Sequence, residues 1–179
     1  MLLEIERRAR FEQLAVPLLD DAMRLAVWLA GSKADAEDIV QESMVRAYRY
    51  LDKFQGASFR PWLLAIVRNT AMTWLKRNRS SNLVLVPDFQ SEEQSIDFDP
   101  PLAEENPEKA VLRRDLADQL KRAVAALPNE FREVIVLREL HDLSYKEIAA
   151  IIDAPIGTIM SRLSRARRLL MAALPEYAS

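Results

Sequence analysis

The chain has 179 residues, half of them apolar, with no cysteine and a single histidine. This composition allows one domain or two small ones, and it excludes disulfide bonds, thiolate metal sites and metal sites made of clustered histidines. The net charge of −2 is divided along the chain: residues 1–86 carry +3 (13 basic, 10 acidic), residues 87–108 carry −8 (8 acidic) and residues 109–179 carry +3 (12 basic, 9 acidic).

No segment predicts insertion into a membrane or passage across one. The apolar runs fall short of the ~20 residues that a membrane-spanning helix needs. Residues 1–11 mix charges of both signs and lack the apolar core of a secretory signal. We therefore expect a cytoplasmic protein, with no cofactor and no bound metal.

The first basic block is predicted to be helical. Leucines at near-helical spacing indicate a helix over residues 11–30, which Gly31 would end. Ser32 can cap the next helix, whose buried stripe runs from Ala36 to Phe54. The opposite, polar face of that helix includes Asp38, Gln41 and Glu42.

A further helix is expected from Pro61 to about Arg77, with Ser58 at its start. Its second half, residues 68–79, combines basic side chains with an asparagine, threonines and Trp74, and the loop 54–59 places aromatic residues near its start. Aromatic rings beside cations suit single-stranded nucleic acid, because rings stack on bases while cations hold phosphates. The alternative is that the tryptophans of this helix belong to the core.

Residues 87–107 hold four prolines, many carboxylates and no sustained periodicity, which predicts an extended linker. One interpretation is a solvated spacer. The other is that its carboxylates imitate a nucleic-acid backbone inside a basic channel of a partner.

The second basic block is predicted to contain four helices. Asn106 and Pro107 would open the first, which Pro128 ends, and a second helix extends over residues 131–143. His141 lies in a polar stretch before the next helix, which Ser144 caps, and we expect it to be a surface turn residue.

The last two of these helices form a helix-turn-helix over residues 144–174. Ser144 and Glu147 form a capping box, and Pro155 and Gly157 are expected to make the turn. In the final helix, apolar residues from Ile159 onward repeat every three or four positions, and its four arginines come with no carboxylate. Such a second helix suits the DNA major groove, although an arginine-bearing face is often only a solvated surface.

The sequence therefore predicts an all-α protein of two small helical domains. The expected boundaries are residues 1–86 for the first domain, 87–106 for the acidic linker and 107–179 for the helix-turn-helix domain.

Two blocks of sequence resemble one family. The first reads DAEDIVQESMVRAYRYLDKF and FRPWLLAIVRNTAMTWLKR, and the second reads LPNEFREVIVLRELHDLSYKEIAAIIDAPIGTIMSRLSRARRLL. In this order, within residues 11–174, they resemble the extracytoplasmic-function (ECF) group of bacterial sigma factors, in the sigma-70 family. The resemblance implies a protein that is not an enzyme, binds core RNA polymerase and directs promoter-specific transcription initiation.

The resemblance also implies a role for each polar surface. Asp38, Gln41 and Glu42 would lie on the clamp helices of the polymerase. Melted −10 DNA would be held by Gln55, Ser58, Arg68, Asn69, Thr73, Trp74 and Arg77. Duplex −35 DNA would be read by Thr158, Met160, Ser161, Arg162 and Arg165. Many relatives carry a basic residue at position 160, and a thioether there can touch a thymine methyl group but cannot donate to guanine or phosphate.

The resemblance has two further implications. The acidic linker would pass near the RNA exit path of the polymerase, where negative charge suits a channel built for RNA. Members of the group are often held inactive by an anti-sigma protein, so such a partner is expected as well.

Other functions are weaker. A conventional helix-turn-helix regulator would explain residues 144–174, but such regulators dimerise on paired half-sites and no dimer helix is evident. An enzyme lacks support because there is no Gly-rich phosphate loop, no metal-ligand cluster and no paired nucleophile and base. A protein that only imitates a sigma factor would not need basic faces on both domains.

Overall fold

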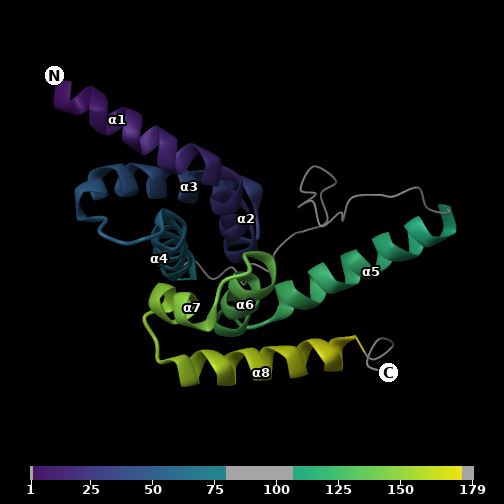
Figure 1. The fold of residues 1–179 in the computed structure, drawn as a ribbon. Helices are drawn as coiled ribbons and strands as arrows, with labels where there is room; N and C mark the ends of the chain where they lie inside the picture. Colours follow the sequence, from purple (N-terminus) through teal and green to yellow (C-terminus); the bar gives the residue numbers. More distant parts are fainter. Residues whose placement is uncertain (1, 80–106, 175–179) are drawn as a thin grey trace.

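The computed structural model describes residues 2–79 and 107–174, and every regular element within these ranges is helical (Figure 1). The expected linker, and both interpretations of it, lie outside the described residues. The elements of the first range are α1 (Leu2–Ala15), η1 (Val16–Leu18), α2 (Leu19–Ala30), α3 (Lys33–Arg49), η2 (Leu51–Lys53) and α4 (Phe59–Arg79). Those of the second range are α5 (Pro107–Ala126), α6 (Asn129–Ile135), η4 (Val136–Leu140), α7 (Tyr145–Ile152) and α8 (Ile156–Ala173).

In the first range, α2, α3 and α4 pack against one another, and α1 lies along the outside (Figure 1). Gly31 ends α2 with a φ of 81°, as predicted, because this left-handed conformation suits a residue without a Cβ. Ser32 caps α3, since its Oγ accepts from the Asp35 N–H at 3.2 Å. Both boundaries confirm the prediction made from local signals.

The predicted helix over residues 11–30 is wrong in one respect. The chain forms two helices there, separated by the 3₁₀ turn η1, which has Pro17 in its first positions. Proline lacks the N–H that a continuous helix would need at this point. The break lets α1 leave the bundle at an angle to α2 (Figure 1).

A second, smaller core holds the start of α4 and the loop before it. The rings of Phe54, Phe59 and Trp62 lie with centroids 5.1–5.4 Å apart, in edge-on or tilted contact. Phe11 of α1 extends this cluster through Phe59 at 6.5 Å. Aromatic packing therefore fixes the ends of the loop, while Gln55 and Ser58 within it remain exposed.

The second range contains the four predicted helices, but the helix expected over residues 131–143 is shorter and irregular. It comprises α6 and the π-helical segment η4, and Asp142 then adopts a φ of 50°. The turn of the helix-turn-helix also differs from the prediction. Asp153 adopts the left-handed conformation (φ 58°) that ends α7, whereas Gly157 lies inside the first turn of α8. The turn is made by Asp153 and Pro155, and Gly157 is not part of it.

The predicted capping box at the start of α7 is confirmed. The Glu147 N–H donates to Ser144 Oγ at 3.3 Å, and the Ser144 N–H donates to the Glu147 carboxylate at 2.8 Å. Hydrogen bonds from Ser144 lower the pKa of Glu147. The box therefore gives hydrogen-bond acceptors to two backbone N–H groups, those of Ser144 and Glu147, at the start of the helix-turn-helix.

Replacing Ser144 by alanine is expected to lower the free energy of unfolding by about 1 kcal/mol, because the Glu147 N–H loses its acceptor. Urea denaturation followed by circular dichroism measures the change. Ser164→Ala is the matched control, since Ser164 is an exposed serine in the middle of α8. Equal stability of the two variants would contradict a role for the box.

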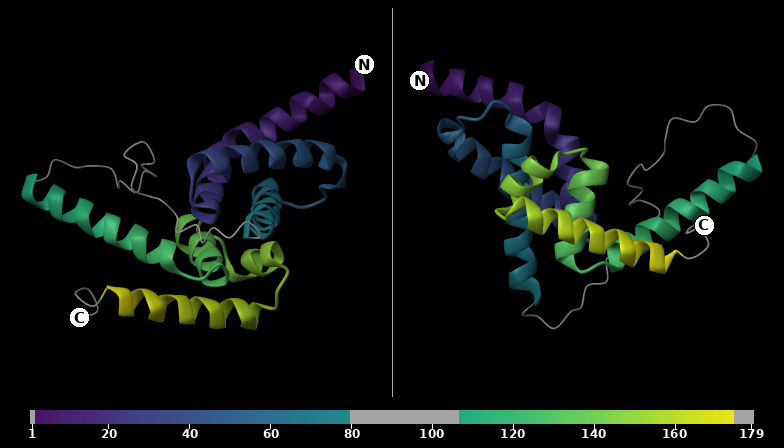
Figure 2. Two further views of the ribbon diagram at one scale, coloured as in Figure 1. Left: turned by 180° about the vertical axis from the view of Figure 1, so that it is seen from behind. Right: turned by 60° about the horizontal axis from the view of Figure 1, so that its bottom comes forward.

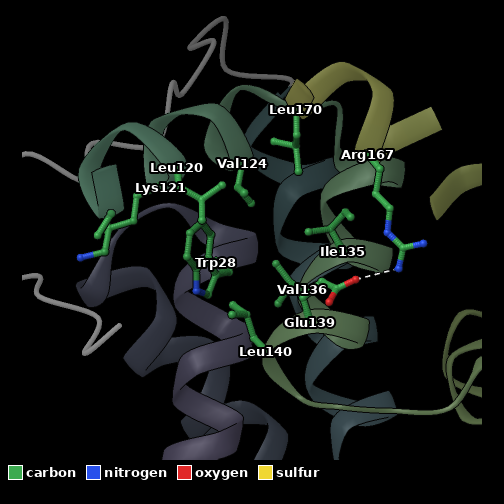
Figure 3. A pocket seen from close by; sticks show the side chains of 11 residues that line it. Trp28, Leu120, Lys121, Val124, Ile135, Val136, Glu139, Leu140, Arg167 and Leu170 are labelled. Carbon is green, nitrogen blue, oxygen red and sulfur yellow. Dashed lines mark hydrogen bonds and ion pairs between the residues drawn. The ribbon is translucent and has the colours of Figure 1, made fainter. Parts of the chain in front are cut away.

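The two ranges pack together into one body. A single apolar cluster includes side chains of α2 and α4 together with side chains of α6, η4, α7 and α8. The helix α4 lies against α7 (Figure 2). Trp28 of α2, 1% exposed, lines an apolar pocket of about 330 Å³ with Leu120, Val124 and Val136 (Figure 3). The predicted helical units therefore share a core.

His141 contradicts the prediction of a surface turn, because it is only 1% exposed. Arg60 of α4 donates to the His141 carbonyl oxygen at 2.9 Å, and the His141 Nδ1 lies 3.7 Å from the Asp21 carboxylate. Packing of the two ranges against each other buries His141, although its neighbours in the sequence are mostly polar. The sequence around His141 gives no sign of this burial.

Candidate promoter and polymerase interface

The apolar side of α8 fixes which residues of the helix face outward. Ile159, Leu163 and Ala166 are buried, as the predicted stripe requires, and α8 packs mainly on α6. Met160, Ser161 and Arg165 are exposed, whereas Thr158 and Arg162 are half-buried. The five predicted −35 residues thus lie within residues 158–165 of α8, and three of them are exposed.

Several polar groups on α8 already have partners within the protein. The Arg165 guanidinium lies over the Phe131 ring at 5.7 Å, a cation–π distance that leaves its N–H groups free to turn outward. Ser161 Oγ donates to the Thr158 carbonyl oxygen at 3.0 Å. Met160 is 54% exposed and offers only an apolar surface. The helix can therefore present one oriented arginine and one apolar side chain to a DNA groove.

The predicted −10 residues lie along α4 and in the loop before it. Asn69 and Arg77 are exposed, and Thr73 donates to the Asn69 carbonyl oxygen at 2.9 Å. Trp74 is half-buried and packs against the main core, so that only part of its ring is accessible. Gln55 and Ser58 lie at the other end of α4, beyond the aromatic cluster.

The outer face of α3 carries the predicted polymerase residues. Asp38, Gln41 and Glu42 are all exposed, and Glu42 forms an ion pair with Arg46 one turn later. Val45 lies on the same face and is 53% exposed, although it was not predicted as a site residue. Its spacing of three, four and seven residues from the other three was the available signal. The outer face of α3 therefore combines one exposed apolar side chain with three exposed polar ones.

The structure also places a buried acidic residue, which the sequence did not single out, between the two predicted DNA-binding surfaces. Glu133 of α6 is 2% exposed. Its carboxylate forms ion pairs with Arg68 of α4, whose Nη2 lies at 2.7 Å, and with Arg162 of α8, whose Nη1 lies at 3.4 Å. Burial raises the pKa of Glu133, while the charge and hydrogen bond of Arg68 oppose that rise. One carboxylate thus contacts an arginine from each of the two predicted DNA-binding surfaces.

The described ranges contain neither a cluster of metal-ligating side chains nor a membrane-spanning helix. Residues 2–79 and 107–174 contain no group of three or more His, Asp or Glu side chains that could hold a metal ion. Among the helices within those same ranges, none combines the length and the apolarity needed to span a membrane.

Comparison with known proteins identifies both halves of the chain. Residues 14–81 match the family model "Sigma-70 region 2", and residues 117–170 match "Sigma-70, region 4". The chain is 42% identical over 142 residues to the ECF RNA polymerase sigma-E factor of Salmonella typhimurium (strain LT2), a match that covers 76% of this chain and 72% of that protein. The corresponding Escherichia coli (strain K12) factor is 41% identical over the same coverage.

Solved structures agree with this assignment. The sigma factor RpoE of Bartonella quintana, determined in complex with the anti-sigma factor NepR, is 30% identical, with a TM-score of 0.68 and coverage of 93% of this chain and 97% of that one. CnrH, determined with the cytosolic domain of CnrY, has the same fold, with a TM-score of 0.65 at 24% identity and coverage of 95% and 90%. The all-α architecture with a helix-turn-helix is thereby confirmed. The chain belongs to the ECF group of RNA polymerase sigma factors, and it directs promoter-specific transcription initiation as a subunit of the polymerase.

Proposed function

We propose that the chain divides this work among three helices within the domain boundaries expected from the sequence, 1–86 and 107–179. The outer face of α3 docks on core polymerase, α4 with its preceding loop holds melted −10 DNA, and α8 reads duplex −35 DNA. The observation that carries the proposal is the placement of three exposed polar faces on three separate helices, one acidic and two basic. A conventional helix-turn-helix regulator would need the basic face of α8 but not the polar faces of α3 and α4.

At the −35 element, Arg165 is the strongest candidate for a base contact. Its position over Phe131 holds the guanidinium near the surface, and an oriented arginine can donate to the O6 and N7 atoms of guanine. Met160 suits a thymine methyl group, and Thr158, Ser161 and Arg162 complete the surface. Phosphate contacts provide affinity, and these side chains provide sequence choice.

At the −10 element, Asn69 and Arg77 are exposed polar residues of α4, with Arg68 and Thr73 beside them. Part of the Trp74 ring is available for stacking, which contributes roughly 1–3 kcal/mol per base in single-stranded complexes. Gln55 and Ser58 border the strand at the other end of the helix.

At the polymerase, Asp38, Gln41 and Glu42 supply polar contacts around Val45. The protein acts in the cytoplasm, where its polymerase works, and it performs no catalysis itself. An anti-sigma protein is a further partner, a proposal supported by the complex of the Bartonella relative with NepR.

A run-off transcription assay with purified bacterial core polymerase tests the proposal. The wild-type protein is expected to produce transcripts from discrete start sites within a promoter pool. Arg165→Ala should reduce them about tenfold or more, because one bidentate base contact is worth about 1–3 kcal/mol. Adding Arg162→Ala should abolish them.

Arg167→Ala is the matched control for the assay. Arg167 lies on the same helix, two turns after Met160, and it pairs with Glu139 of η4 at 2.8 Å. Its transcripts should match those of the wild type. Tight duplex binding without polymerase, together with no transcripts in its presence, would refute the sigma mechanism for this chain.

A further inference from the structure

One aromatic ring at the end of α3 is exposed and has a cation beside it. Tyr50 is 44% exposed, and it is the only exposed aromatic side chain within residues 2–79 and 107–174. Lys53 is exposed as well, and its Nζ lies 5.0 Å from the centre of the Tyr50 ring. Neither residue belongs to the proposed polymerase or DNA surfaces. The pair is therefore a candidate site in its own right.

The backbone holds the ring and the cation together. Tyr50 follows α3 and opens η2, and the Lys53 N–H donates to the Tyr50 carbonyl oxygen at 2.9 Å. Side chains three residues apart in a 3₁₀ turn project from the same side. Leu51, 1% exposed, anchors the turn in the second, smaller core. The turn thus builds the pair, which does not depend on two free side chains meeting in solvent.

The pair borders the loop that is proposed to hold melted DNA. The turn η2 joins the end of α3 to that loop (Figure 1). Gln55, which is exposed, comes two residues after Lys53, so their Cα atoms lie within about 8 Å of each other. Phe54, between them, is held by ring contact with Phe59 at 5.2 Å. A DNA strand that contacts Gln55 can therefore place its neighbouring nucleotide at Tyr50.

The local charge favours an anionic strand. Asp52 is the acidic residue of the turn, and its carboxylate is paired with Arg7 of α1 at 3.3 Å. Arg49, at the end of α3, and Lys53 are both exposed, and neither forms an ion pair with another described residue. Two cations therefore remain available for phosphate groups beside the ring.

We propose that Tyr50 and Lys53 form a further nucleotide-binding site for the melted promoter strand. The Tyr50 ring stacks on one unpaired base, and the Lys53 ammonium contacts a phosphate next to it. This site extends the proposed −10 surface beyond Gln55, and it rests on that proposed function. Stacking on an aromatic ring accepts any base, because every base has a π face. The site therefore strengthens the hold on melted DNA without adding sequence choice.

Binding of the polymerase complex to a fork-junction DNA tests the site. The probe carries a promoter found by the run-off assay, with its −10 segment unpaired, and fluorescence anisotropy of a labelled strand gives the Kd. Tyr50→Ala is expected to weaken binding about tenfold, within the range that one stacked base provides. Tyr50→Leu should lose as much because it keeps apolar bulk without a ring, whereas Tyr50→Trp should retain binding.

Abasic nucleotides identify the base that stacks. Each unpaired position of the probe is made abasic in turn, and the loss of affinity is compared between the wild type and Tyr50→Ala. At one position the two losses should not add, because the missing base and the missing ring remove the same contact. That position should accept any of the four bases in the wild type, with Kd values within about twofold of one another.

The role of Lys53 appears in the salt dependence of binding. Lys53→Gln should weaken binding and reduce the slope of log Kd against log salt concentration by about 0.7, the contribution of one phosphate on a single strand. Val16→Ala is the matched control, since Val16 is an apolar residue, 57% exposed, outside every proposed surface. Its Kd and slope should equal those of the wild type. Circular dichroism verifies that each variant keeps its helical content.

Additive losses for Tyr50→Ala and every abasic position would overturn the site, because no base would then lie on the ring. Weaker binding of Tyr50→Ala to core polymerase, with unchanged affinity for the fork, would overturn it by assigning the ring to a protein contact. Asn69→Ala separates these results from a failure of the −10 proposal. If it weakens fork binding while Tyr50→Ala does not, only the Tyr50 site fails. If neither variant weakens binding, the proposed −10 surface fails together with the site.

Discussion

Replacing Trp28 by alanine is expected to lower the free energy of unfolding by about 3–5 kcal/mol, the range observed when a buried tryptophan or phenylalanine is truncated. Trp28 is 1% exposed and belongs to the apolar cluster shared by both halves. Its ring points from α2 toward Leu120 of α5 and Val136 of η4 (Figure 3). The loss should be large because the ring borders a pocket of about 330 Å³, so that truncation enlarges a space already present.

Urea denaturation measures this change, and two variants calibrate it. Trp28→Phe keeps most of the apolar surface and should cost clearly less than the alanine variant. Trp62→Ala removes a half-buried tryptophan from the smaller aromatic cluster and should also cost less. A loss below about 1 kcal/mol for Trp28→Ala would contradict the shared core, because a tryptophan already exposed to solvent has little burial to lose.

Boundaries set by short-range signals could be predicted from the sequence. Ser32 and Ser144 cap helices because a hydroxyl followed by an acidic residue three positions later satisfies backbone N–H groups locally. Gly31 ends a helix for an equally local reason, its positive φ. The apolar stripe of α8 is likewise fixed by spacing alone, and it placed Ile159, Leu163 and Ala166 on the buried side of the helix.

Errors arose where a local signal had two possible outcomes. Leucines at helical spacing occur both before and after Pro17, so the spacing predicted one continuous helix. The chain instead breaks at η1. In the turn before α8, Gly157 was expected to be one of the turn residues, but the left-handed conformation that ends α7 is taken by Asp153, because an aspartate tolerates it. Gly157 then has no need of its freedom, and a Cβ there would meet nothing within 4 Å.

Contacts between the halves were beyond the reach of the sequence. Glu133 stands in an ordinary amphipathic helix, and only the approach of α4, 65 residues earlier in the chain, gives it Arg68. His141 stands in a polar stretch, and its burial likewise depends on Asp21 and Arg60 from the other half. Both residues owe their environment to packing that a linear pattern does not encode.

Burial of His141 predicts a specific dependence of stability on pH. Burial lowers the pKa of His141 to about 4, against the attraction of Asp21 and with a smaller contribution from Arg60 and Arg24. In the unfolded chain the imidazole has its ordinary pKa of about 6.5. Between these two values the unfolded chain binds a proton that the folded protein does not, so stability falls as pH falls. Above pH 6.5 both forms are neutral, and below about pH 4 both are charged, so the effect is confined to this window.

The gap between the two pKa values corresponds to about 3 kcal/mol. The free energy of unfolding should therefore decrease by about this amount from pH 7 to pH 4 in excess of a His141→Gln variant, which has no imidazole to protonate. The comparison with this variant is necessary because Glu133 titrates in the opposite sense. Burial raises the pKa of that carboxyl, so its protonation in the folded protein opposes the loss at low pH, equally in both proteins. Parallel stability curves for the two proteins across this window would mean that the His141 ring reaches water, and that the halves do not close over it in solution.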